Sequence, residues 1–318
     1  MKVVIVGAGG IGQHIAVQAA NAGHDVVLAS RSGSGLTDAL AAPLGALRTA
    51  RVDASDASAL TALAADAGVI VNAVNPPYTR WPELWPPLAA AFLGAAEHSG
   101  AGLLTVGNLY GYGVPDAPLT EGSPVRPNGV KGRVRAQMWA DALAAHQAGR
   151  VHATEIRASD YFGPGAGAEV SQLNRFVLGP ALAGKTPWQL TGDVRSPHAW
   201  TYLPDIAALA VALIGVDHGG DAWGRPWLVP TEPGRSMTQA VADASQITGT
   251  PLRSPRPLPG FVRAAAHLMP IVRELDEMAP TFATPYEVDT RAAQERFGLA
   301  ATPWTQALTE TITWMRGR

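Results

Sequence analysis

Three glycines near the amino terminus have the spacing of a phosphate-binding turn. Gly7, Gly9 and Gly12 form the pattern G-x-G-x-x-G directly after the β-branched run Lys2–Val6. The first glycine permits a tight turn, the second lets the backbone approach a pyrophosphate, and the third allows a helix to pack closely on the strand. Apolar residues then recur at helical spacing to about Asn21, so a helix start would offer its N–H groups to the phosphates. The dinucleotide site predicted here comprises Gly7, Gly9, Gly10, Ile11 and Gly12; the alternative is a plain glycine turn.

The residues after the second predicted strand indicate which dinucleotide would bind. A site selective for NAD would place an acid here to bind the ribose 2′-hydroxyl. This chain has Arg31 and Ser32 instead, which suit a 2′-phosphate, and they predict NADP. A solvated turn is the alternative. Asp53 would face the adenine, and Asn75 begins a stiff loop at the edge of the sheet where such folds bind ligands.

Composition limits the function classes. The chain has 318 residues, 47% hydrophobic and 16% charged, which suits a folded enzyme and excludes a disordered chain. The net charge of −2 predicts no attraction to nucleic acid or to a membrane surface. There are no cysteines, and the 8 histidines are scattered, so we expect no metal site. We find no targeting segment or membrane span, which predicts a cytoplasmic protein.

Alternating apolar runs and helical patterns predict an α/β fold with a Rossmann-type, doubly wound parallel sheet. Asp205 is expected to cap the helix that follows it. Trp81 and Trp85 are four residues apart and would share one helix face, either as packing under a loop or as a wall of the substrate pocket. Further strands are predicted at Leu47–Val52, Val69–Val74, Gly102–Val106, Val151–Arg157 and Trp227–Pro230, and further helices at Leu88–His98, Ala136–His146 and Ile206–Val216.

Taken together, four segments resemble the extended short-chain dehydrogenase/reductase family, the NAD(P)-dependent epimerase/dehydratase group. The similarity covers most of residues 1–231. The segments are Gly111-Tyr112-Gly113, the prolines Pro124 and Pro127, Arg157–Gly165 (similar to Arg-x-x-Asn-x-Tyr-Gly-Pro-Gly) and His198–Ala207. The resemblance implies a Rossmann domain over 1–165 and 193–231 and a smaller lid domain over 166–192 and 232–318. A homodimer through the helices 88–98 and 136–146 would be usual for the family, with a monomer as the alternative.

The chain departs from the family at all three catalytic positions. Lys131 stands where the family has its catalytic tyrosine, Arg135 where it has lysine, and Asn108 where it has serine. A lysine can exchange the proton that accompanies hydride transfer, and Arg135, one turn on, would bind ribose hydroxyls. Asn108 can offer an N–H to a developing oxyanion. Only three residues of this chain are lysines, so Lys131 is less expected to be a surface residue without a specific role.

Other residues could take part in the site. Tyr110, Tyr112 and Tyr161 are reserve proton donors, each with loop packing as the alternative. Tyr161 and His198 could line the substrate pocket, together with Trp81 and Trp85. For His198 a structural histidine with satisfied hydrogen bonds is the favoured alternative. For Lys131 itself the alternative is a contact to phosphate or ribose without a catalytic role.

We therefore expect an NADP-dependent oxidoreductase that transfers hydride to a carbonyl, imine or conjugated double bond of a small, mostly apolar molecule. The carboxyl-terminal part offers few charges and no arginine cluster for a nucleotide diphosphate. One alternative is a catalytically silent NADP-binding sensor of the NmrA type, which the loss of the catalytic trio favours. A weaker one is a sugar epimerase or dehydratase that uses NAD.

Overall fold

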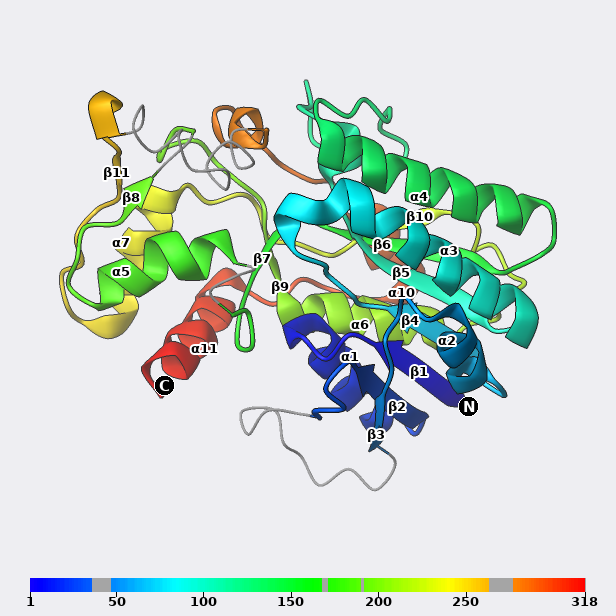
Figure 1. Ribbon diagram of the computed structural model, residues 1–318. Helices are drawn as coiled ribbons and strands as arrows, with labels where there is room; N and C mark the ends of the chain where they lie inside the picture. The colour runs from blue at the N-terminus through cyan, green and yellow to red at the C-terminus, as the bar shows by residue number, and fades with distance from the viewer. Residues whose placement is uncertain (36–46, 168–170, 190–191, 263–276, 318) are drawn as a thin grey trace.

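A seven-stranded sheet forms the centre of the amino-terminal part of the molecule (Figure 1). Its strand order is β10-β6-β5-β4-β1-β2-β3, and all neighbouring strands are parallel. The strands are β1 (Lys2–Val6), β2 (Asp25–Ser30), β3 (Leu47–Arg51), β4 (Val69–Asn72), β5 (Gly102–Asn108), β6 (Ala153–Ala158) and β10 (Pro226–Leu228). This computed structural model describes residues 1–35, 47–167, 171–189, 192–262 and 277–317.

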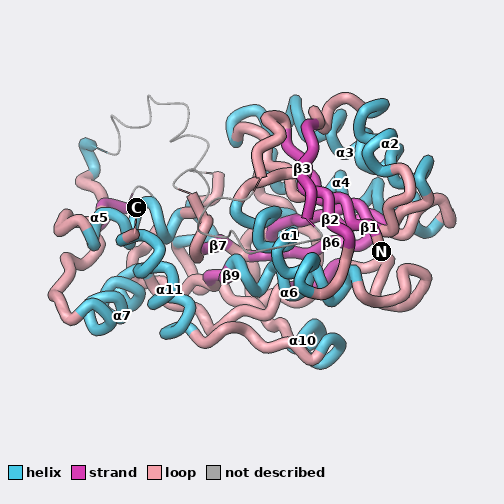
Figure 2. The backbone as a smooth tube through the Cα atoms, turned by 90° about the horizontal axis from the view of Figure 1, so that it is seen from below, coloured by secondary structure: helices cyan, strands magenta, loops and turns pink. Residues whose placement is uncertain are grey.

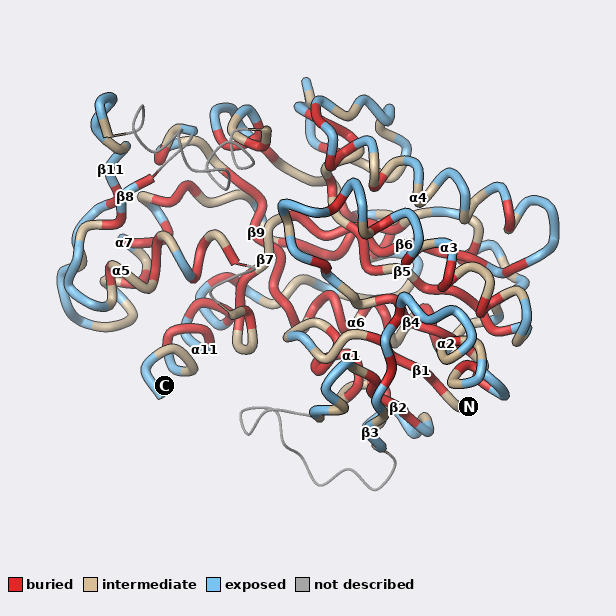
Figure 3. Tube along the Cα trace, in the orientation of Figure 1, coloured by how far each residue is buried: buried red, intermediate tan, exposed pale blue. Residues whose placement is uncertain are grey.

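Helices cover both faces of this sheet, which confirms the predicted Rossmann-type fold. One layer consists of α1 (Gly10–Asn21), α6 (Leu203–Ile214) and α10 (Arg291–Phe297), and the other of α2 (Ala57–Ala64), α3 (Trp81–Ser99) and α4 (Val130–Gln147). The inner strands, from β6 to β2 in the sheet order, are largely buried on both sides (Figure 3), as their continuous apolar runs require. The edge strand β3 is largely exposed. Each layer closes its own apolar core against the sheet.

A smaller, largely helical part lies beside the sheet. It contains α5 (Gly179–Leu182), α7 (Met237–Thr248), α11 (Trp304–Arg316) and the short ribbon of β8 (Trp188–Gln189) and β11 (Arg256–Pro257). Its core includes Val177, Met237, Trp304 and Leu308. Ser236 begins α7 with a capping box, because its hydroxyl accepts from the Gln239 N–H while the Gln239 side chain accepts from the Ser236 N–H.

A second parallel ribbon lies where the two parts meet. It pairs β7 (Asp160–Phe162) with β9 (Trp200–Tyr202), and both views place it between the sheet and the smaller helical part (Figures 1 and 2). Residues at the start of β7 and just before β9 are therefore close to both parts of the molecule.

The carboxyl-terminal chain returns to the sheet layer. Helix α10, which the sequence assigned to the lid, packs against α6 and β10. Ala293 is fully buried in the core of that layer, and the ring of Phe297 meets Trp227 edge-on at 4.9 Å between centroids. The other predicted boundaries between the Rossmann domain and the lid domain, at 165/166, 192/193 and 231/232, remain predictions.

Two local predictions were wrong. Asp205 does not cap a helix, because α6 begins two residues earlier, at Leu203. Pro204 lies in the first turn, where backbone N–H groups have no intrahelical acceptor, so the missing N–H of proline costs no helical hydrogen bond. The carboxylate of Asp205 instead accepts hydrogen bonds from the N–H and hydroxyl of Thr302, at 2.9 and 2.6 Å. The helix predicted from Leu88 begins already at Trp81 and contains Pro86 and Pro87. No helix among the described residues is long and apolar enough to cross a membrane.

Candidate active site

The glycine turn has the geometry that a phosphate-binding turn needs. Gly7 has a φ of 116°, and a Cβ there would overlap the carbonyl of Ala73. A Cβ on Gly12 would overlap the carbonyl oxygen of Gly7, so only glycine fits either position. A Cβ on Gly9 would meet nothing within 4 Å. The first N–H groups of α1, including that of Ile11, have no intrahelical acceptor and point out of this open end of the helix.

Gly10 differs from its neighbours in the turn. A Cβ there would overlap the carbonyl of Gly165 and touch Leu203. Gly10 therefore lets the segment after β7 pack on the start of α1, close to the predicted phosphate site.

The residues predicted to bind the adenosine end follow β2, β3 and β4 at the same edge of the sheet. Arg31, Ser32, Asp53 and Asn75 are all exposed. Hydrogen bonds from the Ser55 N–H and hydroxyl to Oδ1 of Asp53 lower the pKa of that carboxyl, and the charge of Arg31 lowers it further. The structure thus brings Arg31 and Asp53 close enough to interact.

Lys131 lies in the first turn of α4 with only 1% of its side chain exposed. Its Nζ is 4.5 Å from the ring centroid of Tyr78 and 3.4 Å from Oε2 of Glu277. The other carboxylate oxygen of Glu277 accepts the backbone N–H of Lys131 at 2.7 Å. The amine is therefore inside the protein, between an aromatic ring and a carboxylate from the carboxyl-terminal part.

Arg135 lies one turn further along α4 and is also buried, at 6% exposure. Its guanidinium carbon is 4.7 Å and 4.2 Å from the ring centroids of Trp81 and Trp85. Burial lowers the pKa of Arg135 to about 10, which the charge of Glu155 partly opposes. Within the described residues, Nη1 reaches the Val106 carbonyl at 3.4 Å and Nε has no partner. A buried guanidinium with an orphaned N–H indicates a missing hydrogen-bond acceptor.

Tyrosines surround these two cations. Burial raises the pKa of Tyr110 well above its usual value, and Tyr78, which is hydrogen-bonded to it, and Asp160 add to the shift. Burial and Asp160 also raise the pKa of Tyr161 to about 12, against the charge of Arg135. Both phenols are therefore protonated at neutral pH and can donate hydrogen bonds.

The remaining predicted residues are held by structural contacts. Oδ1 of Asn108 accepts the Tyr110 N–H at 3.1 Å, which leaves its amide NH₂ as the donor side. The hydroxyl of Tyr112 accepts from Nη1 of Arg157 at 2.6 Å and donates to the Glu121 carbonyl at 3.4 Å. Trp81 and Trp85 share one helix face, as expected, and that face packs on Arg135.

Three residues of this region were not among the candidates. Tyr78 and Glu277 contact Lys131, and Asp160 is hydrogen-bonded to His198 at 2.8 Å. Only Asp160 left a signal in the sequence, because it replaces the asparagine of the Arg-x-x-Asn-x-Tyr-Gly-Pro-Gly segment.

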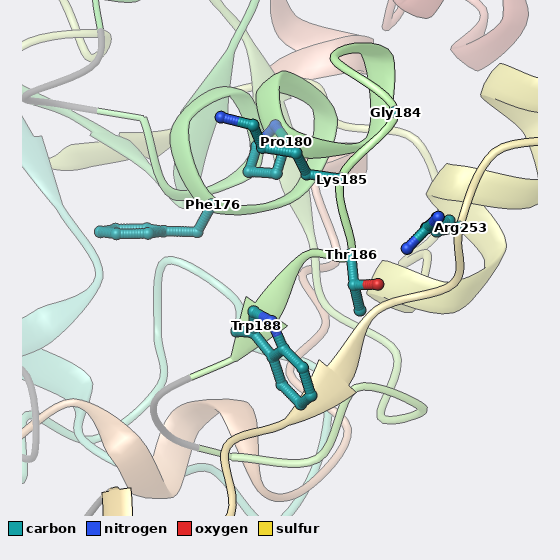
Figure 4. A pocket seen from close by; sticks show the side chains of 7 residues that line it. All are labelled: Phe176, Pro180, Gly184, Lys185, Thr186, Trp188 and Arg253. Atoms are coloured by element: carbon teal, nitrogen blue, oxygen red, sulfur yellow. The ribbon is translucent and has the colours of Figure 1, made fainter.

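A separate hollow of about 680 Å³ lies in the smaller part (Figure 4). None of its lining residues belongs to the predicted site. They are Phe176, Pro180, Gly184, Lys185, Thr186, Trp188 and Arg253.

Residues 3–81 match the family described as "Saccharopine dehydrogenase NADP binding domain". This match covers the glycine turn, Arg31, Asp53 and Asn75. No curated protein sequence matches the chain.

Solved structures share the whole fold. The dTDP-glucose 4,6-dehydratase of Bacillus anthracis, solved with NAD, has a TM-score of 0.80 and 16% identity, over 100% of this chain and 97% of that one. A UDP-glucuronic acid 4-epimerase of Bacillus cereus, also solved with NAD, has a TM-score of 0.80 and 15% identity, over 100% and 99%. A dTDP-glucose 4,6-dehydratase of Streptomyces venezuelae has a TM-score of 0.77 and 20% identity, over 99% and 97%.

The chain therefore has the fold of the extended short-chain dehydrogenases/reductases, as the sequence predicted. The likeness is one of architecture, since identities of 15 to 20% accompany it.

Proposed function

We propose that this protein is an NADP-dependent oxidoreductase in which Lys131 exchanges the proton that accompanies hydride transfer. The single observation that carries the proposal is the burial of Lys131 and Arg135, one turn apart, on α4. Two cations are costly to bury, so their place under an aromatic cover favours a functional role over a structural one.

The residues present fit a nicotinamide dinucleotide. Gly9 leaves open space beside the free N–H groups of α1, where a pyrophosphate would sit. Arg31 and Ser32 would bind a 2′-phosphate, and the orphaned Nε of Arg135 would find its acceptor in a ribose hydroxyl. When bound, the dinucleotide supplies or accepts a hydride at the substrate carbon.

The chain's own side chains would handle the charge and the proton. The ammonium of Lys131 can protonate the atom that becomes anionic as hydride arrives, and Glu277 compensates its charge in the resting site. The NH₂ of Asn108 can donate to the same atom, because its carbonyl oxygen is fixed by Tyr110. Tyr110 and Tyr161, held protonated, would exclude water and orient the substrate.

The test is the oxidation of NADPH with a panel of ketones, enones and imines. Lys131→Met should lower kcat by roughly 10²-fold or more, the usual contribution of a general acid, while NADPH binding is unchanged. Lys185→Met removes an exposed lysine and serves as the matched control. Turnover at the wild-type rate in Lys131→Met would refute the role of Lys131.

A silent NADP-binding sensor is the second candidate, and one observation favours it. The carboxylate of Glu277 covers the amine of Lys131, as a regulatory protein without turnover could tolerate. NADPH binding without oxidation by any member of the panel would support this reading. The sugar-nucleotide activities in the names of the structural neighbours form a third, weaker candidate, tested with NAD and UDP- or dTDP-sugars.

A further inference from the structure

Asp160 is the first residue of β7, and His198 lies two residues before β9. The β7–β9 ribbon lies at the junction of the two parts (Figures 1 and 2). Nε2 of His198 is 2.8 Å from Oδ2 of Asp160. The imidazole is 2% exposed, whereas the carboxylate side chain is 17% exposed. A ligand in the site could therefore touch Asp160 but not His198.

The hydrogen bonding of His198 defines the charge of the pair. Nδ1 of His198 is buried and has no partner among the described residues. A proton on Nδ1 would leave a buried N–H unsatisfied, so the favoured form carries its only ring hydrogen on Nε2 and donates it to Asp160. The imidazole is then neutral, and the pair has a net charge of −1.

Aromatic rings hold this pair in place. The imidazole stacks on Phe282 and Tyr286, with ring centroids 4.2 and 5.2 Å apart and interplanar angles of 11° and 13°. Burial raises the pKa of Tyr286, as it does for Tyr110 and Tyr161, and in all three the charge of Asp160 contributes to the shift. Asp160 therefore lies close enough to these three tyrosines for its charge to influence the pKa of each phenol.

Two other carboxylates of the region have cationic partners. Glu277 is paired with Lys131, and Glu155 lies 2.7 Å from Nε of Arg157. Among the described residues Asp160 forms no ion pair with a lysine or arginine. A partly buried carboxylate that has no lysine or arginine partner among the described residues, and that lies close to several tyrosines, has features that favour a bound ammonium or iminium group.

We propose that Asp160, positioned by His198, binds the positively charged nitrogen of an amine or imine substrate. This inference rests on the proposed function and narrows its substrate class. In the reductive direction Lys131 protonates the imine nitrogen, the dihydronicotinamide gives a hydride to the carbon, and the C=N π pair becomes the lone pair of the product amine. Asp160 stabilises the iminium charge before hydride transfer, and a ketone has no such charge to stabilise.

The experiment compares benzylamine with benzyl alcohol, two probes that differ in charge but little in size. Binding is measured by tryptophan fluorescence and calorimetry on the full chain, with and without NADP⁺. We expect benzylamine to bind about tenfold more tightly, the effect of one charge-assisted contact. Asp160→Asn, which keeps the size and an acceptor oxygen, should abolish this preference and leave NADP⁺ affinity unchanged. Asp66→Asn, at an exposed loop position, is the matched control.

His198 is tested as a positioning residue. His198→Phe keeps a stacking ring but loses the donor, and should reduce the amine preference. His198→Gln retains an N–H donor and should largely preserve this preference.

Equal affinity for both probes in the wild type, or a preference that survives in Asp160→Asn, would overturn the proposal. An amine preference in a protein that binds no dinucleotide would refute the oxidoreductase and leave the cation site standing. Dinucleotide binding without an amine preference would refute the cation site and leave the oxidoreductase proposal standing.

Discussion

The amine of Lys131 lies 3.4 Å from the carboxylate of Glu277, although 146 positions separate the two residues in the sequence. Asn128 extends the contact by donating from its side-chain amide to the Glu277 carbonyl at 3.2 Å. A residue of the carboxyl-terminal part thus covers the start of the helix that carries both buried cations. Any substrate that reaches Lys131 must share the site with this carboxylate.

Glu277→Gln should destabilise the fold, because it removes a charged partner of the buried Lys131 amine. We expect a loss of about 1 to 3 kcal/mol in the free energy of unfolding, measured by urea denaturation. The double variant Lys131→Met/Glu277→Gln should lose less than the sum of the two single variants. Glu83→Gln, which breaks the exposed pair with Arg80, should cost less than about 1 kcal/mol. Strict additivity of the two single variants would show that the amine and the carboxylate do not interact.

Gly9→Ala should leave the fold intact and weaken dinucleotide binding. Gly9 has φ −75° and ψ 179°, which alanine adopts freely, and its Cβ would stand where the phosphates approach. We expect the Kd for NADPH, measured by fluorescence titration, to rise about tenfold or more. Gly94→Ala, a helical glycine with equally open surroundings, is the control and should not change this Kd. An unchanged Kd in Gly9→Ala would place the phosphates elsewhere.

Arg31→Ala should change the choice of cofactor. Loss of a charge-assisted contact to the 2′-phosphate should raise the Kd for NADPH by about 10- to 100-fold and leave that for NADH nearly unchanged. The exposed Arg133, changed to alanine, controls for a general loss of positive charge. An equal rise in the Kd values for NADPH and NADH would contradict a specific contact between Arg31 and the 2′-phosphate and would favour the solvated-turn interpretation.

His14→Gln should flatten the dependence of stability on pH. His14 is buried, with Nε2 2.9 Å from the Pro164 carbonyl, and burial lowers its pKa below the usual 6.5. As pH falls below that value the unfolded chain binds a proton that the folded chain does not, so the wild type loses stability.

The size of this loss depends on the pKa difference, at about 1.4 kcal/mol per unit. Glutamine keeps the N–H donor to Pro164 but cannot titrate, so urea denaturation at about pH 7.5 and about pH 5 should show a smaller loss in the variant. His98→Gln, at an exposed position, should follow the wild type. Identical slopes in wild type and His14→Gln would exclude His14 as a source of acid sensitivity.

The parts of the fold that depend on local pattern could be predicted from the sequence. The strand Lys2–Val6, the glycine turn and the helix after it are consecutive, and each step is set by residue types a few positions apart. The sequence predicted the start of α3 at Leu88, seven residues after its actual start at Trp81. Pro86 and Pro87 locally disfavour a helix, but the packing of Trp81, Trp85 and Phe92 in the core stabilises it.

The site itself could be predicted only in part. Lys131 and Arg135 were found because they stand at the positions of the catalytic tyrosine and lysine of the family that the chain resembles. The contact to Glu277 joins segments that no local pattern relates, and the partner of His198 depends on how β7 pairs with β9. Asp160 differs from asparagine by its negative charge and by the loss of the amide donor. The role of this change can be argued only once the phenols and the imidazole around Asp160 are known.

The return of α10 to the sheet layer has a consequence for how the protein can be made. Ala293 is a buried member of an apolar layer whose other buried members lie at or before Val229, and Phe297 packs against this layer. A ribosome must therefore release nearly the whole polypeptide before that layer can close. A polypeptide that ends after β10 would lack α10, so part of the apolar surface of α6 and β10 would be exposed to solvent. We expect such a truncated chain to aggregate.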